Sequence, residues 1–378
     1  TNTSVMKAFQ GYEITQPIAH KFHIQGQLVN SNLDTTLVAT NSSYYKGQHV
    51  LSNPYTAAIR ISDIELGDGM EQTIYIYNTG SFSNWQTAAS NPDNSIPGHY
   101  LAIPKNQTNY IMPSISSMQG FVVKVAPLST SGRLKINYSS VADKNNFAQR
   151  VNSEDNLNEE KIYSIVDVRS EHYVDRMWLF TDANCTSNFD NGWDGPKMLT
   201  SGAAAQLFAA ESDGNYQVNS KADINDTYLG FKAGQEDSNY TLYFKHMNIA
   251  ERYKNLSLLD LQTGSVTDIT ADESQYNFVA TNVESTQNRF KIISIAKDEI
   301  ENENNGISSF LEGNTIFINN YNNTNGQVYI YDMSGRMILQ KALGAKAVTV
   351  LTLPTYQAMY IAKVSCGENE TTKKYIIN

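Results

Sequence analysis

Short runs of strand-forming residues, separated by turn-forming residues, are the feature that most constrains the fold of this chain. The run Thr73–Tyr77 alternates isoleucine with hydroxyl-bearing side chains, which places Ile74 and Ile76 on one face of a strand. Similar runs recur along the chain, and clusters of Gly, Pro, Asn and Asp such as "LGDG" and "SNPDNSIPG" separate them. The pattern predicts an all-β fold of consecutive antiparallel β-sandwich domains of jelly-roll-like type.

Two polar, acidic stretches divide these runs into groups. They read "NSEDNLNEE" at 152–160 and "DEIENENNG" at 298–306. A chain of 378 residues is also too long for one ordinary sandwich. We therefore expect a first β-sandwich over 1–148, a second over 149–299, and a small immunoglobulin-like sandwich of six or seven strands over 306–378. The segment "TSGAAAQLFAAESD" (200–213) is the one stretch expected to form a short helix or a loop.

Composition and charge exclude several classes of function. The net charge of −10 and a pI near 5.1 argue against a nucleic-acid partner, which would need a basic surface. No apolar run approaches the roughly 20 residues of a transmembrane segment. The first residues lack a signal peptide and already resemble a strand pattern, so we expect that an upstream segment is missing.

Catalytic and cysteine motifs are also lacking in the sequence. The two cysteines form neither a disulfide framework nor a metal-binding pattern. Neither a metalloprotease motif, a hydrolase nucleophile elbow nor a phosphate-binding loop occurs, so we predict that the chain is not an enzyme. A pair of carboxylates for glycoside hydrolysis stays open at this level, because such pairs are assembled in space.

The densest polar cluster lies in "TDANCTSNFDNGWDG" (181–195). Calcium takes several oxygen ligands from loops of this kind, and the candidate ligands are Asp182, Asn184, Asp190 and Asp194. Their spacing does not fit an EF-hand. The alternative is a structural loop in which these side chains form Asx-turns. No other cofactor is expected. The nearby Trp178 and Trp193 could stack on a sugar or pack in the core.

The C-terminal residues carry a resemblance to a known family. They read "VYIYDMSGRMI" (328–338), "LTLPTYQAMYIAKV" (351–364) and "TTKKYIIN" (371–378). This spacing resembles the C-terminal sorting domains of the type IX secretion system of Bacteroidetes, and the matching positions include Asp332, Gly335, Arg336, Lys373 and Lys374. The resemblance implies export through the type IX secretion machinery. The two lysines could otherwise be charges that protect an edge strand from aggregation.

The rest of the chain resembles secreted and cell-surface proteins of Bacteroidetes. The segments that carry this resemblance include "LSNPYTAAIRISDI" (51–64) and "WLFTDANCTSNFDNGWDGPKML" (178–199). It implies a secreted or surface-attached, adhesin-like protein at the outer cell surface or outside the cell, and it does not imply a ligand. The absence of catalytic motifs favours a non-enzymatic role, and we expect an unidentified surface protein or glycan as the partner. The alternative is the carbohydrate-binding part of a larger secreted glycan-degrading protein.

Overall fold

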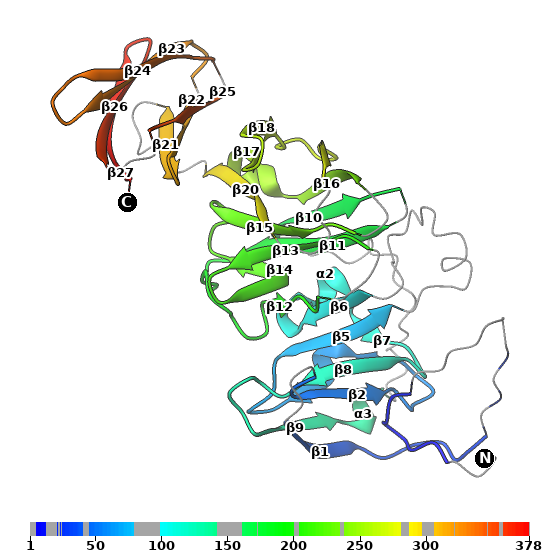
Figure 1. Cartoon of the computed structure of the whole chain (residues 1–378). Helices are drawn as coiled ribbons and strands as arrows, with labels where there is room; N and C mark the ends of the chain where they lie inside the picture. The colour runs from blue at the N-terminus through cyan, green and yellow to red at the C-terminus, as the bar shows by residue number, and fades with distance from the viewer. Residues whose placement is uncertain are drawn as a thin grey trace. The chain divides into compact units, whose positions relative to one another are not determined.

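The protein divides into two compact units. Figure 1 labels their strands and helices along the chain. Unit 1 holds residues 1–251 and 269–293, and unit 2 holds residues 252–268 and 294–378. Within unit 1 we call residues 5–141 the N-terminal region and the residues from 161 onward the central region. We call residues 306–377 of unit 2 the C-terminal module. The structure is a computed structural model that describes residues 5–12, 21, 23, 25–40, 45–78, 99–141, 161–171, 173–199, 204–234, 238–280, 287–296, 306–320, 322–345, 347–354 and 358–377.

The prediction of an all-β fold is confirmed. Strands dominate each unit, and the described helices are short. The two acidic stretches that were expected to separate the domains lie outside the described residues, apart from Gly306. The division into domains at 1–148, 149–299 and 306–378 therefore stays a prediction. Among the residues that the structure describes, no helix has both the length and the apolar character needed to cross a membrane.

Three small antiparallel sheets form the N-terminal region. Its strands are β1 (Leu33–Val38), β2 (Gln48–Ser52), β3 (Ile59–Arg60), β4 (Ile64–Leu66), β5 (Thr73–Asn78), β6 (His99–Pro104), β7 (Ser114–Ile115), β8 (Gly120–Lys124) and β9 (Ser131–Ile136). Its helical turns are η1 (Ile61–Asp63), η2 (Lys105–Gln107), α2 (Thr108–Ile111) and α3 (Tyr138–Val141). The strand orders are β1-β9-β4, β2-β8-β5-β6 and β3-β7.

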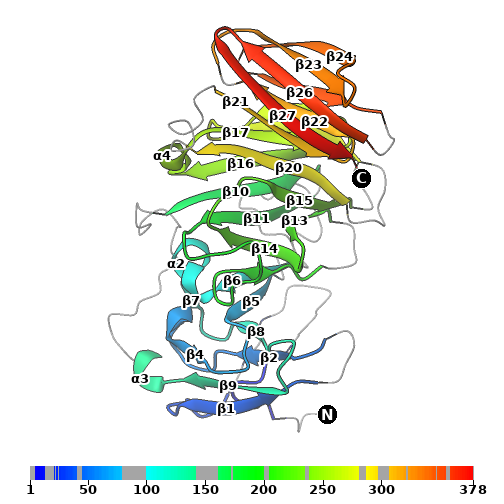
Figure 2. The same cartoon turned by 90° about the vertical axis from the view of Figure 1, so that its left-hand side faces the viewer.

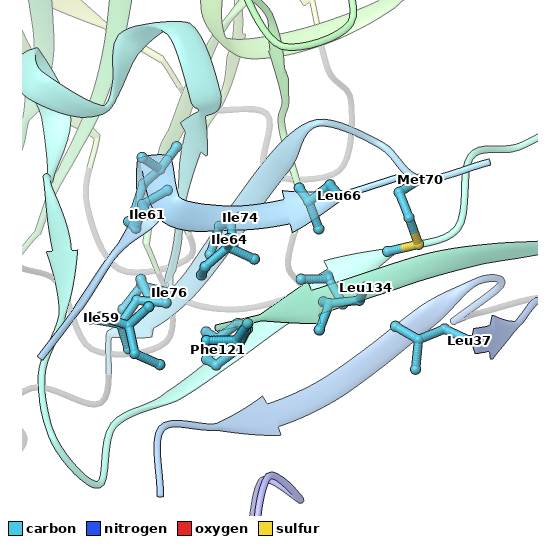
Figure 3. Close-up of a cluster of buried hydrophobic side chains, with 14 of the residues drawn as sticks. Leu37, Ile59, Ile61, Ile64, Leu66, Met70, Ile74, Ile76, Phe121 and Leu134 are labelled. Atoms are coloured by element: carbon cyan, nitrogen blue, oxygen red, sulfur yellow. The ribbon is translucent and has the colours of Figure 1, made fainter. Parts of the chain in front are cut away.

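One hydrophobic core holds these sheets together (Figure 3). Ile74 and Ile76 of β5 point into this core with Ile64 and Phe121, as the alternation of β5 predicts. Burying one such side chain contributes about 1.5–3 kcal/mol. The other face of β5 is buried as well, because Tyr75 belongs to a second cluster with Ala102 and Val122, against which Met198 of the central region packs. Strand β5 is therefore covered on both faces.

A larger sheet forms the central region. Its strands within unit 1 follow the order β20-β15-β13-β14-β11-β10-β16-β19, and β12 pairs with β14 beside them. One pairing departs from the antiparallel pattern, because β11 and β14 run parallel, with Trp178 opposite Val218. The elements are β10 (Ile162–Arg169), β11 (Val174–Thr181), β12 (Gly195–Pro196), β13 (Gln206–Glu211), β14 (Gly214–Lys221), β15 (Thr227–Lys232), β16 (Asn239–Met247), α4 (Ile249–Arg252), β19 (Gln275–Val279) and β20 (Gln287–Ala296).

The prediction of a helix or loop at 200–213 is wrong for residues 206–211. Residues 206–211 form strand β13, which lies between β14 and β15. Leu207, Phe208 and Ala209 are all buried, so the strand is covered on both faces. A strand that is buried on both faces shows no alternation of apolar and polar residues in its sequence, and its alanines favour a helix in local sequence analysis. Tertiary packing has overridden the local propensity.

Unit 2 contains a hairpin and the C-terminal module. The hairpin joins β17 (Tyr253–Asp260) to β18 (Ser265–Asp268). The module, orange to red in Figure 2, has two antiparallel sheets of order β21-β22-β25 and β24-β23-β26-β27 around one core. These seven strands form the small immunoglobulin-like sandwich that the sequence predicts. They are β21 (Ile307–Glu312), β22 (Thr315–Asn320), β23 (Gly326–Asp332), β24 (Met337–Leu343), β25 (Ala347–Thr352), β26 (Ala358–Cys366) and β27 (Asn369–Ile377).

Candidate functional site

The loop that connects β11 to β12 contains all four predicted calcium ligands. We call residues 182–194 the joint loop. Its first carboxylate, Asp182, accepts hydrogen bonds from the backbone N–H and the side-chain amide of Asn184, both at 3.0 Å, which makes an Asx-turn. The Nζ of Lys161 donates to its other oxygen at 2.6 Å. Burial alone raises the pKa of Asp182, but the hydrogen bonds from Lys161 and Asn184 outweigh it and lower the pKa below its usual value.

The two other carboxylates of the set bind backbone N–H groups of the loop and its surroundings. Asp190 accepts from the backbone N–H of Thr186 at 2.5 Å. Asp194 is fully buried, and its two oxygens accept from the backbone N–H groups of Asp190 at 2.8 Å and Ser220 at 2.7 Å. Burial raises the pKa of Asp194 to about 7, although the two N–H donors favour the charged form.

These contacts define what a cation would have to displace. Within the described ranges, no three His, Cys, Asp or Glu side chains lie close enough together to hold a metal ion. A calcium ion at the joint loop would replace the hydrogen bonds that Asp190 and Asp194 accept from backbone donors. Calcium binding stays a prediction. The alternative, a structural loop built on Asx-turns, is supported at Asp182, which forms such a turn.

The joint loop connects the central region to the N-terminal region, a role that sequence reasoning missed. The side chain of Asn191 accepts from the backbone N–H of Gln72 at 2.7 Å and donates to the carbonyl of Met70 at 3.3 Å. The carbonyl of Gly192 accepts from the N–H of Asn106 at 2.9 Å. Gly192 has a φ of +95°, and a Cβ there would lie 3.3 Å from the Cβ of Gln72. Glycine is therefore favoured by both backbone conformation and space.

A buried group of charged side chains forms the second part of this junction. The carboxylate of Asp175 lies 3.1 Å from Nδ1 of His99, accepts from Nζ of Lys197 at 2.5 and 2.7 Å, and accepts from the N–H of Leu207 at 2.7 Å. The side chains of Asp175 and Lys197 are each only 2% exposed. Burial alone raises the pKa of Asp175, but Lys197 and His99 outweigh it and hold the pKa well below its usual value.

The sequence contains one signal for this group. Asp175 stands in "VDRMWLFT" and shares the alternation of the buried Met177 and Leu179, so a charged side chain falls on a buried face of a strand. Such a charge requires a partner. Its partners lie 76 residues away at His99 and 22 residues away at Lys197, and no local pattern identifies them.

Aromatic packing completes the junction and involves Trp178. Trp178 is buried beside Tyr163 and Phe180, and Tyr110 of the N-terminal region packs against the same cluster. The packing interpretation therefore holds for Trp178. Trp193 is half-buried, with the ammonium of Lys161 4.7 Å from its ring centroid. The contacts of the joint loop, the charged group and this cluster all join the two regions of unit 1.

The Asp-Met-Ser-Gly-Arg segment of the C-terminal module forms a tight turn between β23 and β24. The carboxylate of Asp332 accepts from the backbone N–H of Ser334 at 2.9 Å and from that of Arg336 at 3.0 Å. The guanidinium of Arg336 donates back to it at 3.1 Å. Gly335 has a φ of +82°, which glycine adopts without strain. The three motif residues therefore have a structural reason for their spacing.

The two terminal lysines differ in their surroundings. Nζ of Lys373 donates to the carbonyl of Ser309 in β21 at 2.5 Å, so it links the two sheets of the module. Lys374 is exposed on the opposite face of β27, across from Ile361 of β26. Lys374 is therefore the better candidate for recognition by a partner, whereas Lys373 also contributes to the fold.

Comparisons with known proteins bear on the whole chain and on its C-terminal part. Residues 295–378 match a family model described as a domain of unknown function, DUF8694. The chain is 28% identical over 394 residues to the minor fimbrium subunit Mfa5 of Porphyromonas gingivalis, in an alignment that covers 99% of this chain and 31% of Mfa5. The chain thus spans about a third of the length of that relative.

Two solved structures were also compared. One is a DUF3244 family protein with an immunoglobulin-like β-sandwich fold from Bacteroides vulgatus, 15% identical, with a TM-score of 0.19 over 20% of this chain and 87% of that one. The other is the BSP domain of a biofilm associated protein, 8% identical, with a TM-score of 0.20 over 92% of this chain and 67% of that one. These TM-scores are too low to support an argument, so the fold rests on the sheets described above.

Proposed function

We propose that this chain is part of a non-enzymatic cell-surface protein that acts in adhesion or ligand binding. The observation that carries the proposal is the 28% identity to a fimbrial subunit over almost the whole chain. The β-sandwich fold adds little, because such folds carry many functions. Deletion of the gene in the native host should reduce adhesion of the cells to a surface or to a partner cell. Unchanged adhesion would contradict the proposal.

We further propose that the C-terminal module directs export through the type IX secretion machinery to the cell surface. The support is the Asp332, Gly335 and Arg336 turn together with Lys373 and Lys374 on the last described strand. Deletion of residues 306–378 in the native host should abolish delivery, measured by protease accessibility on intact cells. Delivery at the level of the full chain would refute the sorting proposal.

Point variants separate recognition from folding in this module. Lys374→Ala should lower delivery without changing the melting temperature, since Lys374 is exposed. Lys373→Ala should also lower the melting temperature, because it removes the hydrogen bond to Ser309. The exposed strand residue Lys254 lies outside the module and supplies the matched control, Lys254→Ala. Equal delivery of the Lys374 and Lys254 variants would argue against a role for Lys374.

Calcium binding by the joint loop is a separate proposal. Its support is the oxygen-rich set Asp182, Asn184, Asp190 and Asp194 on one loop. Calcium should raise the melting temperature of protein treated with EGTA, and Asp190→Asn should remove that rise. A melting temperature that calcium does not change would refute it.

The alternative function is the carbohydrate-binding part of a larger secreted glycan-degrading protein. Both this alternative and adhesion to a glycan predict a sugar ligand. Only the alternative requires a catalytic domain elsewhere in the full protein. The complete reading frame distinguishes the two, because only the alternative needs a glycan-degrading domain in it.

A further inference from the structure

A groove opens at one end of the central sheet and shares no residue with the joint loop. Its volume is about 470 Å³, within the usual range for ligand pockets. It lies where β10 ends, β16 begins and β19 ends. Most of its lining residues carry polar side chains, namely Arg169, Ser170, Glu171, Asn239, Thr241 and Asn277.

Strand register explains why these polar side chains gather on one surface. Thr241 of β16 lies directly opposite Arg169 of β10 and Asn277 of β19, so the three form a row across one face of the sheet. Further along β10, the same face carries Tyr163, which packs against Phe180 and Tyr110 at the junction. One end of the face is therefore covered by the N-terminal region, and the other end forms the groove.

The side chains of the groove are already ordered. The hydroxyl of Thr241 donates to the amide oxygen of Asn277 at 2.7 Å, which leaves the NH₂ of Asn277 as a donor. The guanidinium of Arg169 stands 3.9 Å from the ring centroid of Tyr243 and donates to Asp167 at 3.0 Å. Ordered side chains lose little entropy when a ligand binds.

One donor in the groove has no acceptor among the described residues. Nε of Arg169 is hidden from solvent and makes no hydrogen bond within that part of the chain. Buried donors are normally paired, so an unpaired one needs an explanation. The guanidinium must therefore turn for a ligand to reach Nε, and an acceptor oxygen in the groove would then supply the missing partner.

Charge and polarity select the class of ligand. Arg169 is the one cation among the described lining residues, and the carboxylates of Asp167 and Glu171 stand on the same strand or the turn after it. A phosphate or another strongly anionic ligand would therefore meet little net positive charge. The lining places these donors and acceptors beside the exposed apolar side chain of Val279, and a sugar presents both hydroxyl groups and apolar C–H groups. Sugar hydroxyl groups both donate and accept.

We propose that this groove binds a segment of a neutral oligosaccharide in a surface glycan. The inference rests on the proposed adhesive function and names the chemical class of its ligand. Thr241 and Asn277 hydrogen-bond sugar hydroxyl groups, and the guanidinium of Arg169 donates to a further sugar oxygen.

The test is an array of immobilised neutral oligosaccharides, namely glucans, mannans, galactans and N-acetylhexosamine polymers, probed with the purified 378-residue chain. A hexasaccharide of the sugar that gives the strongest signal on the array is then titrated into the chain by calorimetry. Thr241→Ala and Asn277→Ala should each weaken binding about tenfold, the loss expected for one or two hydrogen bonds. Thr36→Ala, a strand threonine of the N-terminal region, is the matched control and should bind as the unaltered chain does.

A second measurement does not depend on the folding of variants. Hydrogen exchange of the unaltered chain with and without the hexasaccharide should show protection at residues 169–171, 239–241 and 277–279. The assignment would be overturned if the chain bound none of the neutral sugars on the array, or if both groove variants bound sugar as well as the unaltered chain. Binding of a peptide strand in the groove in place of sugar would overturn it too. Suppose that deletion of the gene reduces adhesion but the chain binds no sugar on the array. The proposed ligand class is then wrong, and the proposed adhesive function stands.

Discussion

The buried carboxylate of Asp175 allows the sharpest test of how unit 1 is held together. It joins His99 of β6 in the N-terminal region to Lys197 and the N–H of Leu207 in the central region. Asp175→Asn keeps the size of the side chain and removes its charge. The ammonium of Lys197, which is 2% exposed, would then stay buried without a counter-charge.

The expected cost follows from that unpaired ammonium. Breaking a buried ion pair by removing one partner destabilises a protein by about 3–5 kcal/mol. Removal of the second charge relieves part of this cost, so Asp175→Asn/Lys197→Met should be more stable than Asp175→Asn alone. Asp34→Asn is the matched control, because Asp34 pairs with Arg133 on the surface of the same unit and exposed pairs contribute little.

The assay is urea unfolding at pH 7, followed by tryptophan fluorescence, since Trp178 and Trp193 lie in the central region. The pKa of Asp175 is lowered in the fold, so its stabilisation is present above pH about 4 and is lost as the pH falls through the folded pKa. A loss below about 1 kcal/mol for Asp175→Asn would refute the reasoning. A double variant less stable than the single variant would refute it too.

Three further outcomes are expected. Asn191→Ala should lower the free energy of unfolding by about 1–2 kcal/mol, because the N–H of Gln72 loses its acceptor, whereas Asn188→Ala in the same loop should have little effect. The pKa of Asp194 is raised to about 7, so between about pH 4 and pH 7 the folded state holds a proton that the unfolded state has lost, and the free energy of unfolding should fall as the pH rises through this range. Asp194→Asn should flatten this pH dependence in urea titrations at several pH values. An unchanged pH dependence would contradict the assignment. Cys185 and Cys366 are free and buried, and the pKa of Cys185 is raised to about 12. Neither thiol should therefore react with a thiol reagent at pH 8 until the protein is unfolded. Rapid labelling of the folded chain would show that the two thiols are not buried.

The sequence by itself determined the local features of this protein. Alternation placed Ile74 and Ile76 on one buried face, and the Asp332 to Arg336 spacing indicated a tight turn, since each depends on residues a few positions apart. Strand count likewise predicted the sandwich of the C-terminal module.

Only the tertiary structure decided what covers each strand. Alternation placed Tyr75 on the face opposite the isoleucines but did not show that Met198 of the central region packs against it. The stretch around Leu207 was expected to be a short helix or a loop and is a strand between two others. The joint loop read as a candidate calcium loop, but the contact of Asn191 with Gln72 spans 119 residues of sequence. A local pattern records which faces are apolar, whereas the partner that covers a face comes from a distant segment and leaves no periodic signal.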